Sequence, residues 1–537
     1  MQGRSFVHNG ITLLSGIDPV RRSERIIEAV NVKDNTLYFC PSPLYGYGLE
    51  KLLSRLEMAA PNSAVLCIEA DSKLYETAQE NIPLSIKQNK KFHLTNVCDQ
   101  RQLVCLVSEK WGAMSFRYIE TVQLTGGWQL SGGLYNSLCD TLRREIAVNW
   151  SNALTLTKLG RLYIRNALRN LSLLKSFQSI SNLSFADSPV LVLGAGPSLD
   201  EILQAIEGFG IKDKENITNR SFKIICVDTC LRALLDRNII PDLVVILESQ
   251  HWNIRDFFGC RAREIPSALD LSALPASARL LSGDGYLFFT PWTQLNIFER
   301  LKDAHLLPSV ISPLGSVGLT AVELAKKLTC GKIICAGIDF SFTQDQYHAR
   351  NAPGHLSKLK KQNRFNSMLS PSVFENSSVV LSKSGKKART NQIMKNYRNL
   401  FEQEFSSDTR IFDIEGTGLP LGIKTLSLKE AFELLKTKGQ EKERKKERRF
   451  MDEDGKKIKI FLESEKNRLE NLKAILTGED ESDNKKLSIL IDECDYLWAH
   501  FPDCSGGRKP NLEDLSYLKR VRIEIDPMLK LLEGLEL

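Results

Sequence analysis

The stretch Val190-Leu191-Val192-Leu193-Gly194-Ala195-Gly196-Pro197-Ser198-Leu199-Asp200 joins an apolar run to a glycine turn and the start of a helix. Ser198 and Glu201 have the S-x-x-E spacing of a capping box. The apolar positions that follow recur at i, i+3, i+4 and i+7, at Leu199, Ile202, Leu203 and Ile206. We therefore predict a strand, a turn and a helix. The turn would present backbone N–H groups to an anionic ligand at the positive end of that helix.

Four later apolar runs each lead to an acid. These pairs are Phe222–Val227 with Asp228, Leu243–Leu247 with Glu248, Lys332–Ala336 with Asp339, and Arg410–Ile414 with Glu415. In an open parallel sheet the carboxyl ends of the strands meet at one edge, where ligands bind. Residues 185–426 are therefore predicted to form a Rossmann-like α/β domain with its site at that edge.

Other domains are expected on both sides. Residues 1–140 alternate strand and helix patterns, which predicts a second α/β domain. Its turn Pro43–Gly48 and the run Ile68–Asp71 resemble a degenerate nucleotide-binding half, with a purely structural module as the alternative. Residues 141–184 are predicted to be a helical connector and linker. Residues 427–537 are predicted to be a helical region that begins with a charged run.

The composition of the 537 residues predicts a soluble, multidomain protein, with 42% apolar and 26% charged residues. The net charge of +7 is modest for this length and does not favour a nucleic-acid partner. Twelve cysteines without a C-x-x-C pair indicate a reducing cytoplasm. No secretion signal and no apolar run of about 18 residues is present, so we expect no membrane partner.

The glycine turn departs from the dinucleotide fingerprint. Leu199 occupies the third glycine position, and Asp228 follows Gly194 by 34 residues rather than about 20. NAD is therefore disfavoured, and the absence of a G-x-x-x-x-G-K-[ST] sequence excludes an ordinary P-loop kinase. A tight turn that binds nothing is the alternative.

A second glycine element, Pro313–Gly318, opens another predicted helix. Two such turns can hold different parts of one nucleotide. Asp339 is interpreted either as a partner of a ribose or substrate hydroxyl or as a helix cap. His348 and His355 are candidate general bases in a nearby loop, with surface histidines as the alternative. No metal-binding motif accompanies them, so no metal is predicted.

Together, several of these motifs resemble the bacterial motility accessory factor family. They are Gly194-x-Gly196-Pro197-Ser198-Leu199, Val227-Asp228, Ile240-Pro241-Asp242, Gly315-Ser316-Val317, Gly337-Ile338-Asp339-Phe340 and Tyr347-His348-Ala349. That family shares its central domain, of the MptE-like (DUF115) type, with archaeal 6-hydroxymethylpterin diphosphokinases. The resemblance implies a flagellin glycosyltransferase that attaches nonulosonic acids to Ser and Thr.

The order of motifs is also similar to that of metal-independent bacterial sialyltransferases, which use CMP-activated sugars. By this resemblance Gly194, Gly196, Pro197 and Ser198 would form the turn that contacts phosphate or ribose. Asp228 and Glu248 would meet the nucleotide, Gly315 and Ser316 the ribose or sugar, and Tyr347 the phosphate. The chain departs from that pattern at Asp228 and Glu248, where amides are usual, and at Ser341, where an aromatic is usual. The catalytic histidine of those enzymes also lies further along than His348.

The predicted function is transfer of a nonulosonic acid from a CMP-sugar to flagellin, with His348 and Asp339 as the catalytic residues. No cofactor is expected besides the donor. One alternative is an ATP-dependent 6-hydroxymethyl-7,8-dihydropterin diphosphokinase, with Mg²⁺ at Asp228, Glu248 and Asp339. The other is a non-catalytic protein that binds flagellin. The expected partners are flagellin and a nucleotide sugar, the expected location is the cytoplasm, and homo-oligomer formation stays open.

Overall fold

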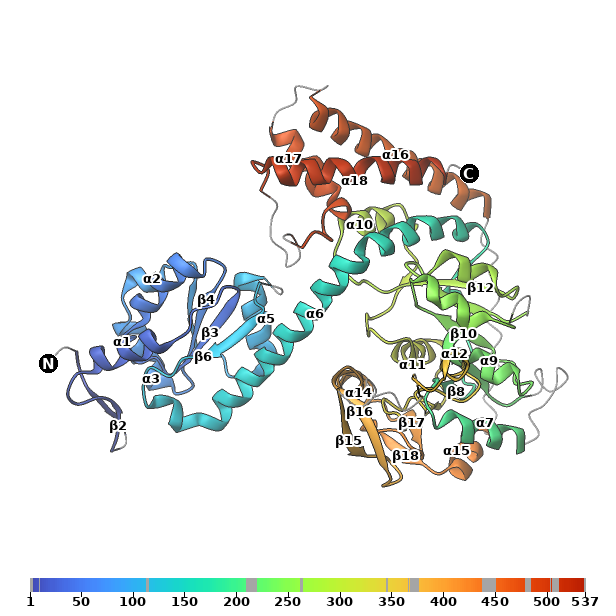
Figure 1. Cartoon of the computed structure of the whole chain (residues 1–537), viewed down its shortest axis with the longest axis horizontal. Coiled ribbons are helices and arrows are strands. Elements are labelled where there is room, and N and C mark those ends of the chain that lie inside the picture. Colours follow the sequence, from blue (N-terminus) through green and yellow to red (C-terminus); the bar gives the residue numbers. More distant parts are fainter. Residues whose placement is uncertain are drawn as a thin grey trace. The chain divides into compact units, whose positions relative to one another are not determined.

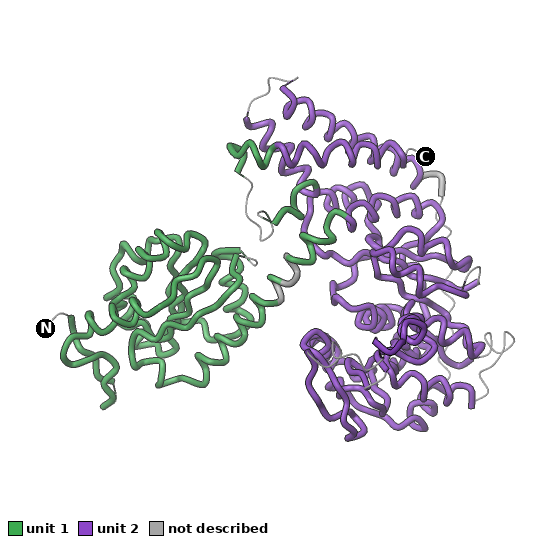
Figure 2. Tube along the Cα trace, viewed as in Figure 1, with its two compact units in different colours: residues 1–161, 497–518 green, residues 162–496, 519–537 purple. Residues whose placement is uncertain are grey.

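The computed structural model (Figure 1) describes residues 3–8, 10–112, 115–208, 220–260, 264–343, 346–365, 367, 376–436, 451–478, 484–502, 504 and 511–535. The chain forms two compact units. Unit 1 comprises Met1–Arg161 and Leu497–Leu518, and unit 2 comprises Leu162–Tyr496 and Lys519–Leu537 (Figure 2). The helix α6 (Gly132–Asn170) is 39 residues long and contributes to both units.

Unit 1 contains a four-stranded parallel sheet with the order β5-β4-β3-β6. β3 (Thr36–Pro41) and β4 (Ala64–Ile68) are buried along their whole length, as expected for central strands of a sheet covered on both faces. Alternate residues of β3 lie in two hydrophobic clusters: Tyr38 is in one and Phe39 in the other. The strand-helix alternation predicted here is confirmed.

The remaining elements of unit 1 are β1 (Phe6–His8), β2 (Ile11–Leu14), α1 (Pro19–Ala29), α2 (Leu49–Ala59), α3 (Ser72–Asn81), α4 (Leu84–Lys87), β5 (Phe92–Thr95), α5 (Gln100–Trp111), β6 (Tyr118–Thr121) and η1 (Gly127–Ser131). Strands β1 and β2 form a separate antiparallel pair.

Unit 2 is built around a ten-stranded sheet in which every strand pair is parallel. The order is β13-β12-β11-β10-β9-β8-β14-β17-β18, with β7 also paired to β12. The strands are β7 (Gln178–Ser179), β8 (Val190–Leu193), β9 (Lys223–Val227), β10 (Leu243–Ile246), β11 (Ser267–Asp270), β12 (Gly285–Phe289), β13 (Ser309–Val310), β14 (Ile333–Ala336), β17 (Ile411–Ile414) and β18 (Lys424–Leu426).

After β7, the chain enters the main strand order at β8, in the interior of the sheet. Strands β9 to β13 follow on one side of β8, and β14, β17 and β18 lie on its other side. The order therefore reverses between β8 and β14, which is the topological switch point. The predicted α/β class with a Rossmann-like central domain is confirmed. Within the segment 141–184, predicted as a helical connector and linker, Gln178 and Ser179 form β7, which pairs with β12.

Helices and short turns complete unit 2. They are η2 (Leu171–Lys175), η3 (Ile180–Asn182), α7 (Leu199–Gly208), α9 (Asp228–Leu235), η4 (His251–Phe257), η5 (Pro275–Arg279), α10 (Asn296–Asp303), α11 (Val317–Leu328), α12 (Pro353–Lys361), α14 (Gln392–Phe405), α15 (Leu428–Leu435), α16 (Met451–Thr477), α17 (Asn484–Glu493), η6 (Asp495–Leu497) and α18 (Leu515–Glu533), which begins in unit 1. Strands β15 (Ser377–Leu381) and β16 (Lys387–Asn391) form an antiparallel hairpin.

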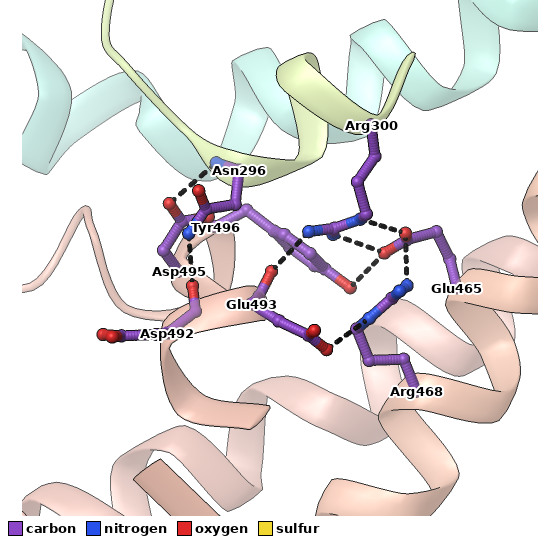
Figure 3. Close-up of polar contacts among 8 residues, drawn as sticks. All are labelled: Asn296, Arg300, Glu465, Arg468, Asp492, Glu493, Asp495 and Tyr496. Carbon is purple, nitrogen blue, oxygen red and sulfur yellow. Dashed lines mark hydrogen bonds and ion pairs between the residues drawn. The ribbon is translucent and has the colours of Figure 1, made fainter. Parts of the chain in front are cut away.

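A buried ion-pair network joins the C-terminal helices to α10 (Figure 3). Glu465 on α16 is 1% exposed and receives two hydrogen bonds from Arg300 on α10, from Nε at 2.6 Å and from Nη2 at 2.9 Å. Arg468 donates to the same carboxylate at 2.6 Å and to Glu493 at 2.8 Å. Asn296 anchors the start of α10, because its N–H donates to Asp495 at 2.9 Å.

The C-terminal region predicted to be helical contains α15, α16, α17 and α18 with turns between them, and α16 and α17 lie in unit 2. Most of the charged run predicted at residues 436–457 lies outside the described residues. The predicted domain boundaries at 140, 184 and 426 stay predictions. Within the described part of the chain, no helix is long and apolar enough to span a bilayer.

Candidate functional site

A cavity of about 320 Å³ lies at the carboxyl edge of the unit 2 sheet. The residues that line it follow directly after consecutive strands: Asp228 after β9, Glu248 after β10, Ser272 after β11 and Thr290 after β12. This is the edge at which open parallel sheets place their ligands. Asp228 and Glu248, predicted to share a site, therefore line the same cavity.

Asp228 is a buried residue of the cavity lining and is held by several hydrogen bonds. Its carboxylate accepts hydrogen bonds from Asn253 Nδ2 at 2.6 Å and from the N–H and hydroxyl of Thr229 at 2.7 and 3.1 Å. Ser277 donates to Asn253 Oδ1 at 2.8 Å, which fixes the orientation of that amide. Burial raises the pKa of Asp228 to about 6 in spite of these donors.

Asp256 is a second carboxyl in the same cavity, and no sequence pattern marked it. It belongs to η4 and is half-buried. Burial and then the negative charge of Asp228 raise its pKa to about 7. Two cavity carboxyls thus titrate near neutral pH, which is typical of functional sites.

The N-terminus of α11 places a positive partial charge at the cavity, opposite in sign to the carboxylates. Gly315 and Val317 line the cavity, and Gly315 has a left-handed backbone with φ of 67°. Ser316 caps the helix without a side-chain cap hydrogen bond. The N–H groups of the first turn have no intrahelical acceptor, and the helix dipole is positive there. This end of the cavity is therefore suited to an anionic group, as predicted for the second glycine element.

Two aromatic rings form part of the cavity wall. The centroids of Tyr163 and Trp292 are 5.0 Å apart with an interplanar angle of 58°. Among the described residues, the indole N–H of Trp292 is buried and has no hydrogen-bond acceptor. A buried donor without an acceptor is costly, so a bound ligand that accepts from it would be stabilised.

Two buried asparagines of α6 hold the loops around the cavity. Asn166 Nδ2 donates to the carbonyls of Ser249 and Ser272 at 3.0 and 3.2 Å. Asn170 Nδ2 donates to the carbonyls of Leu271 and Ala273, both at 2.9 Å. These asparagines were predicted only as part of a connecting helix. Their spacing of four residues on one helix face was the available signal.

The Gly194–Ser198 turn lies at the switch point and does not line this cavity. Gly196 N–H donates to the Gly337 carbonyl at 2.8 Å. The N–H and hydroxyl of Ser198 donate to the Asp339 carboxylate at 2.7 and 2.5 Å. These donors are therefore engaged inside the protein. The capping role predicted for the Ser198 hydroxyl is replaced by this bond to Asp339.

The glycines of the turn are required by this close approach of two strand ends. A Cβ at position 194 would come within 2.5 Å of the Gly337 carbonyl oxygen, and one at position 196 within 2.5 Å of Asp339 Oδ2. Pro197 and Ser198 are buried. The turn thus contacts Asp339, whereas the predicted phosphate contact stays a prediction.

Tyr347 and His348 also lie outside the lining of the cavity. The Tyr347 ring stacks on Phe342, with the two ring centroids 4.2 Å apart. Lys358 Nζ also lies 4.2 Å from the centroid of the Tyr347 ring. Burial, followed by the charge of Lys358, lowers the pKa of His348 to about 4. Its imidazole is therefore neutral at pH 7 and a weak base. His355, the other predicted base, is buried on α12.

The comparison with known protein families identifies the domain that contains this cavity. Residues 163–345 match the family model described as 6-hydroxymethylpterin diphosphokinase MptE-like. This segment is therefore similar to MptE-like proteins. Every residue that lines the cavity, from Tyr163 to Thr320, lies within the matched segment.

The fold extends the similarity beyond the MptE-like domain. The structure of a MAf glycosyltransferase from Magnetospirillum magneticum AMB-1 matches with a TM-score of 0.57 and 12% identity, over 98% of this chain and 89% of that chain. With the MptE-like match, this confirms the predicted resemblance to the motility accessory factor family.

Two relatives in sequence come from one organism. The chain is 29% identical over 532 residues to an uncharacterised protein of Treponema pallidum (strain Nichols), which covers 95% of this chain and 90% of that protein. A second uncharacterised protein of the same strain is 27% identical over 229 residues, 42% of this chain and 47% of that protein.

Proposed function

We propose that this protein is a glycosyltransferase that moves a nonulosonic acid from a CMP-activated donor to Ser or Thr hydroxyls of flagellin. The MptE-like domain and the fold shared with the MAf glycosyltransferase support the reaction class. The observation that carries the proposal is the composition of the cavity. It combines a helix N-terminus for an anion with carboxyls that accept hydrogen bonds from hydroxyls.

In this proposal the donor phosphate lies at the start of α11, next to Gly315 and Ser316. The charge that develops on the departing CMP is stabilised by the first-turn N–H groups. The exposed Glu248 accepts hydrogen bonds from ribose or sugar hydroxyls, whereas the buried Asp228 orders η4 through Asn253. The Tyr163 and Trp292 rings provide the apolar wall that a base or sugar ring requires.

The other predicted residues take indirect roles. The N–H groups of three turn residues are already engaged, that of Gly194 with the Ala336 carbonyl, that of Gly196 with the Gly337 carbonyl and that of Ser198 with Asp339, and Pro197 has no N–H. We therefore place the phosphate at α11. Tyr347, His348 and Asp339 remain predicted site residues without a place in the cavity lining.

We place the reaction in the cytoplasm, where reducing conditions keep cysteines as thiols. The activated donor carries its own leaving group, so the proposed reaction uses no further cofactor. Flagellin is the proposed acceptor, and the proposal does not depend on homo-oligomer formation.

Titration calorimetry tests the choice of nucleotide. We expect CMP to bind without Mg²⁺, and ATP to bind weakly with or without it. Mass spectrometry of flagellin from cells with and without the protein tests the reaction. A glycan mass that is the same in both flagellins would contradict the proposal. Failure to bind either nucleotide would instead favour a non-catalytic protein that binds flagellin.

A diphosphokinase of 6-hydroxymethyl-7,8-dihydropterin is a second candidate, favoured by the description of the matched family. Its Mg²⁺ would require the strand-end acids together. Asp228 and Glu248 line the cavity, but Asp339 is bonded to Ser198 and does not. Mg²⁺-dependent binding of ATP with no binding of CMP would support this candidate over the transferase.

A further inference from the structure

The cavity carboxyls differ in their exposure and in the number of hydrogen bonds that they already accept. Asp228 is 2% exposed, and its two oxygens accept the three hydrogen bonds described above. A carboxylate held in this way orders its surroundings but leaves little room for a substrate hydroxyl. Glu248 is exposed and accepts from the Gln250 N–H at 2.8 Å.

Asp256 combines access with an environment that holds a proton near neutral pH. It lines the cavity and is half-buried, and it lies on η4 three residues after Asn253. The Asn253 amide donates to Asp228 and accepts from Ser277, so the turn that carries Asp256 is anchored at Asn253.

We propose that Asp256 is the catalytic base of the transfer proposed above. Its carboxylate accepts the proton of the acceptor hydroxyl while that oxygen bonds to the anomeric carbon of the donor. The bond between the anomeric carbon and the phosphate oxygen breaks at the same step, and CMP leaves with the electron pair.

Other charged groups around η4 affect the same proton. Arg255 on η4 and Glu248 are near enough to act on Asp256 through their charges. The remaining charged or titratable groups on the elements that pack against η4 are Asp228, Cys230 and Arg232 on α9, Arg279 on η5, and His355 and the lysines of α12.

The test uses the full chain, CMP-pseudaminic and CMP-legionaminic acid as donors, and unglycosylated flagellin as the acceptor. Asp256→Asn keeps the size of the side chain and removes the base. We expect it to bind CMP as the wild type does in calorimetry, and to transfer sugar about 10²- to 10⁴-fold more slowly. Asp256→Glu should recover part of this rate. Asp303→Asn, an exposed carboxyl on α10, is the matched control and should leave the rate unchanged.

The pH dependence separates a base from a merely structural group. The wild-type rate should fall below about pH 7, because the protonated carboxyl cannot accept a proton. Asp256→Asn should lack this decline. A variant that binds CMP and transfers within threefold of the wild type, or that retains the decline, would overturn the role of Asp256.

This inference rests on the proposed function, and the two fail differently. A wild-type protein that transfers no sugar and binds no CMP overturns both. A wild-type protein that transfers sugar, with an Asp256→Asn variant that does so equally well, overturns only the role of Asp256.

Discussion

At the scale of single residues, the cavity depends on side chains that never touch a ligand. Asn166 is 1% exposed, and its amide joins two loops from different strands through the carbonyls of Ser249 and Ser272. Both serines line the cavity. The shape of the site is thus set partly by a helix that precedes the sheet in sequence.

Replacing Asn166 by Leu should weaken the site and the fold together. The substitution leaves two buried carbonyls without donors, at a cost of about 1–3 kcal/mol each. We expect a lower free energy of unfolding in urea and weaker CMP binding in calorimetry. Ser172→Ala, in the following turn η2, is the control and should change neither. Unchanged stability and affinity in Asn166→Leu would contradict this role.

Only some of the site residues could be predicted from the sequence, for a physical reason. Asp228 and Glu248 follow apolar runs, and the regular geometry of strands brings such positions to one edge. Asp256 and Asn253 lie in η4, a seven-residue turn without apolar periodicity, so nothing in the local pattern marks them. The local S-x-x-E spacing predicted that Ser198 caps its own helix. Its actual partner, Asp339, is 141 residues away in sequence, so no local pattern could indicate the bond between them.

At the scale of elements, the attachment of α16 to α10 depends on a single carboxylate. Glu465 neutralises both Arg300 and Arg468 inside the protein. A buried charge without its partner is strongly unfavourable, although an intact buried pair contributes little net stability.

Glu465→Gln should therefore lower the free energy of unfolding by about 3–5 kcal/mol, the cost of breaking a buried pair from one side. Chemical denaturation would measure this loss. Glu470→Gln, an exposed position on the same helix, should shift the free energy by less than about 0.5 kcal/mol. Equal effects of the two variants would show that the network is not a determinant of stability.

Elements with strong apolar patterns were predicted well, and short edge elements were not. β4 and β8 are continuous apolar runs, the first bounded by Ser63 and Glu69 and the second by Pro189 and Gly194, so their positions were clear. β7 has two residues and no apolar pattern, and it exists because β12 offers hydrogen-bonding partners. Pairing of this kind depends on the tertiary fold and leaves no local signal.

At the scale of the whole molecule, the two compact units should unfold as separate cooperative systems. We expect two transitions in differential scanning calorimetry. Leu53→Ala empties a buried position in unit 1 and should lower one transition, at a cost of about 2–5 kcal/mol. Glu465→Gln should lower the other. A single transition that both variants shift equally would contradict this independence.

The order of strands in unit 2 was beyond sequence reasoning, although the α/β class was not. Patterns define each strand separately, whereas the order depends on which strands pair. The reversal between β8 and β14 is what places the Gly194 turn against Gly337.

That contact leaves no room for a side chain at position 196. A Cβ there would lie 2.5 Å from Asp339 Oδ2 and 2.7 Å from the Gly337 carbonyl oxygen, so a shorter residue at 339 would relieve only one of the two clashes. Gly196 should therefore resist replacement even when residue 339 is changed with it. The G-x-G-P-S and G-I-D motifs would then indicate close steric contact between the ends of two neighbouring strands. Ligand preference would vary independently, with the residues of the loops after β9 to β12.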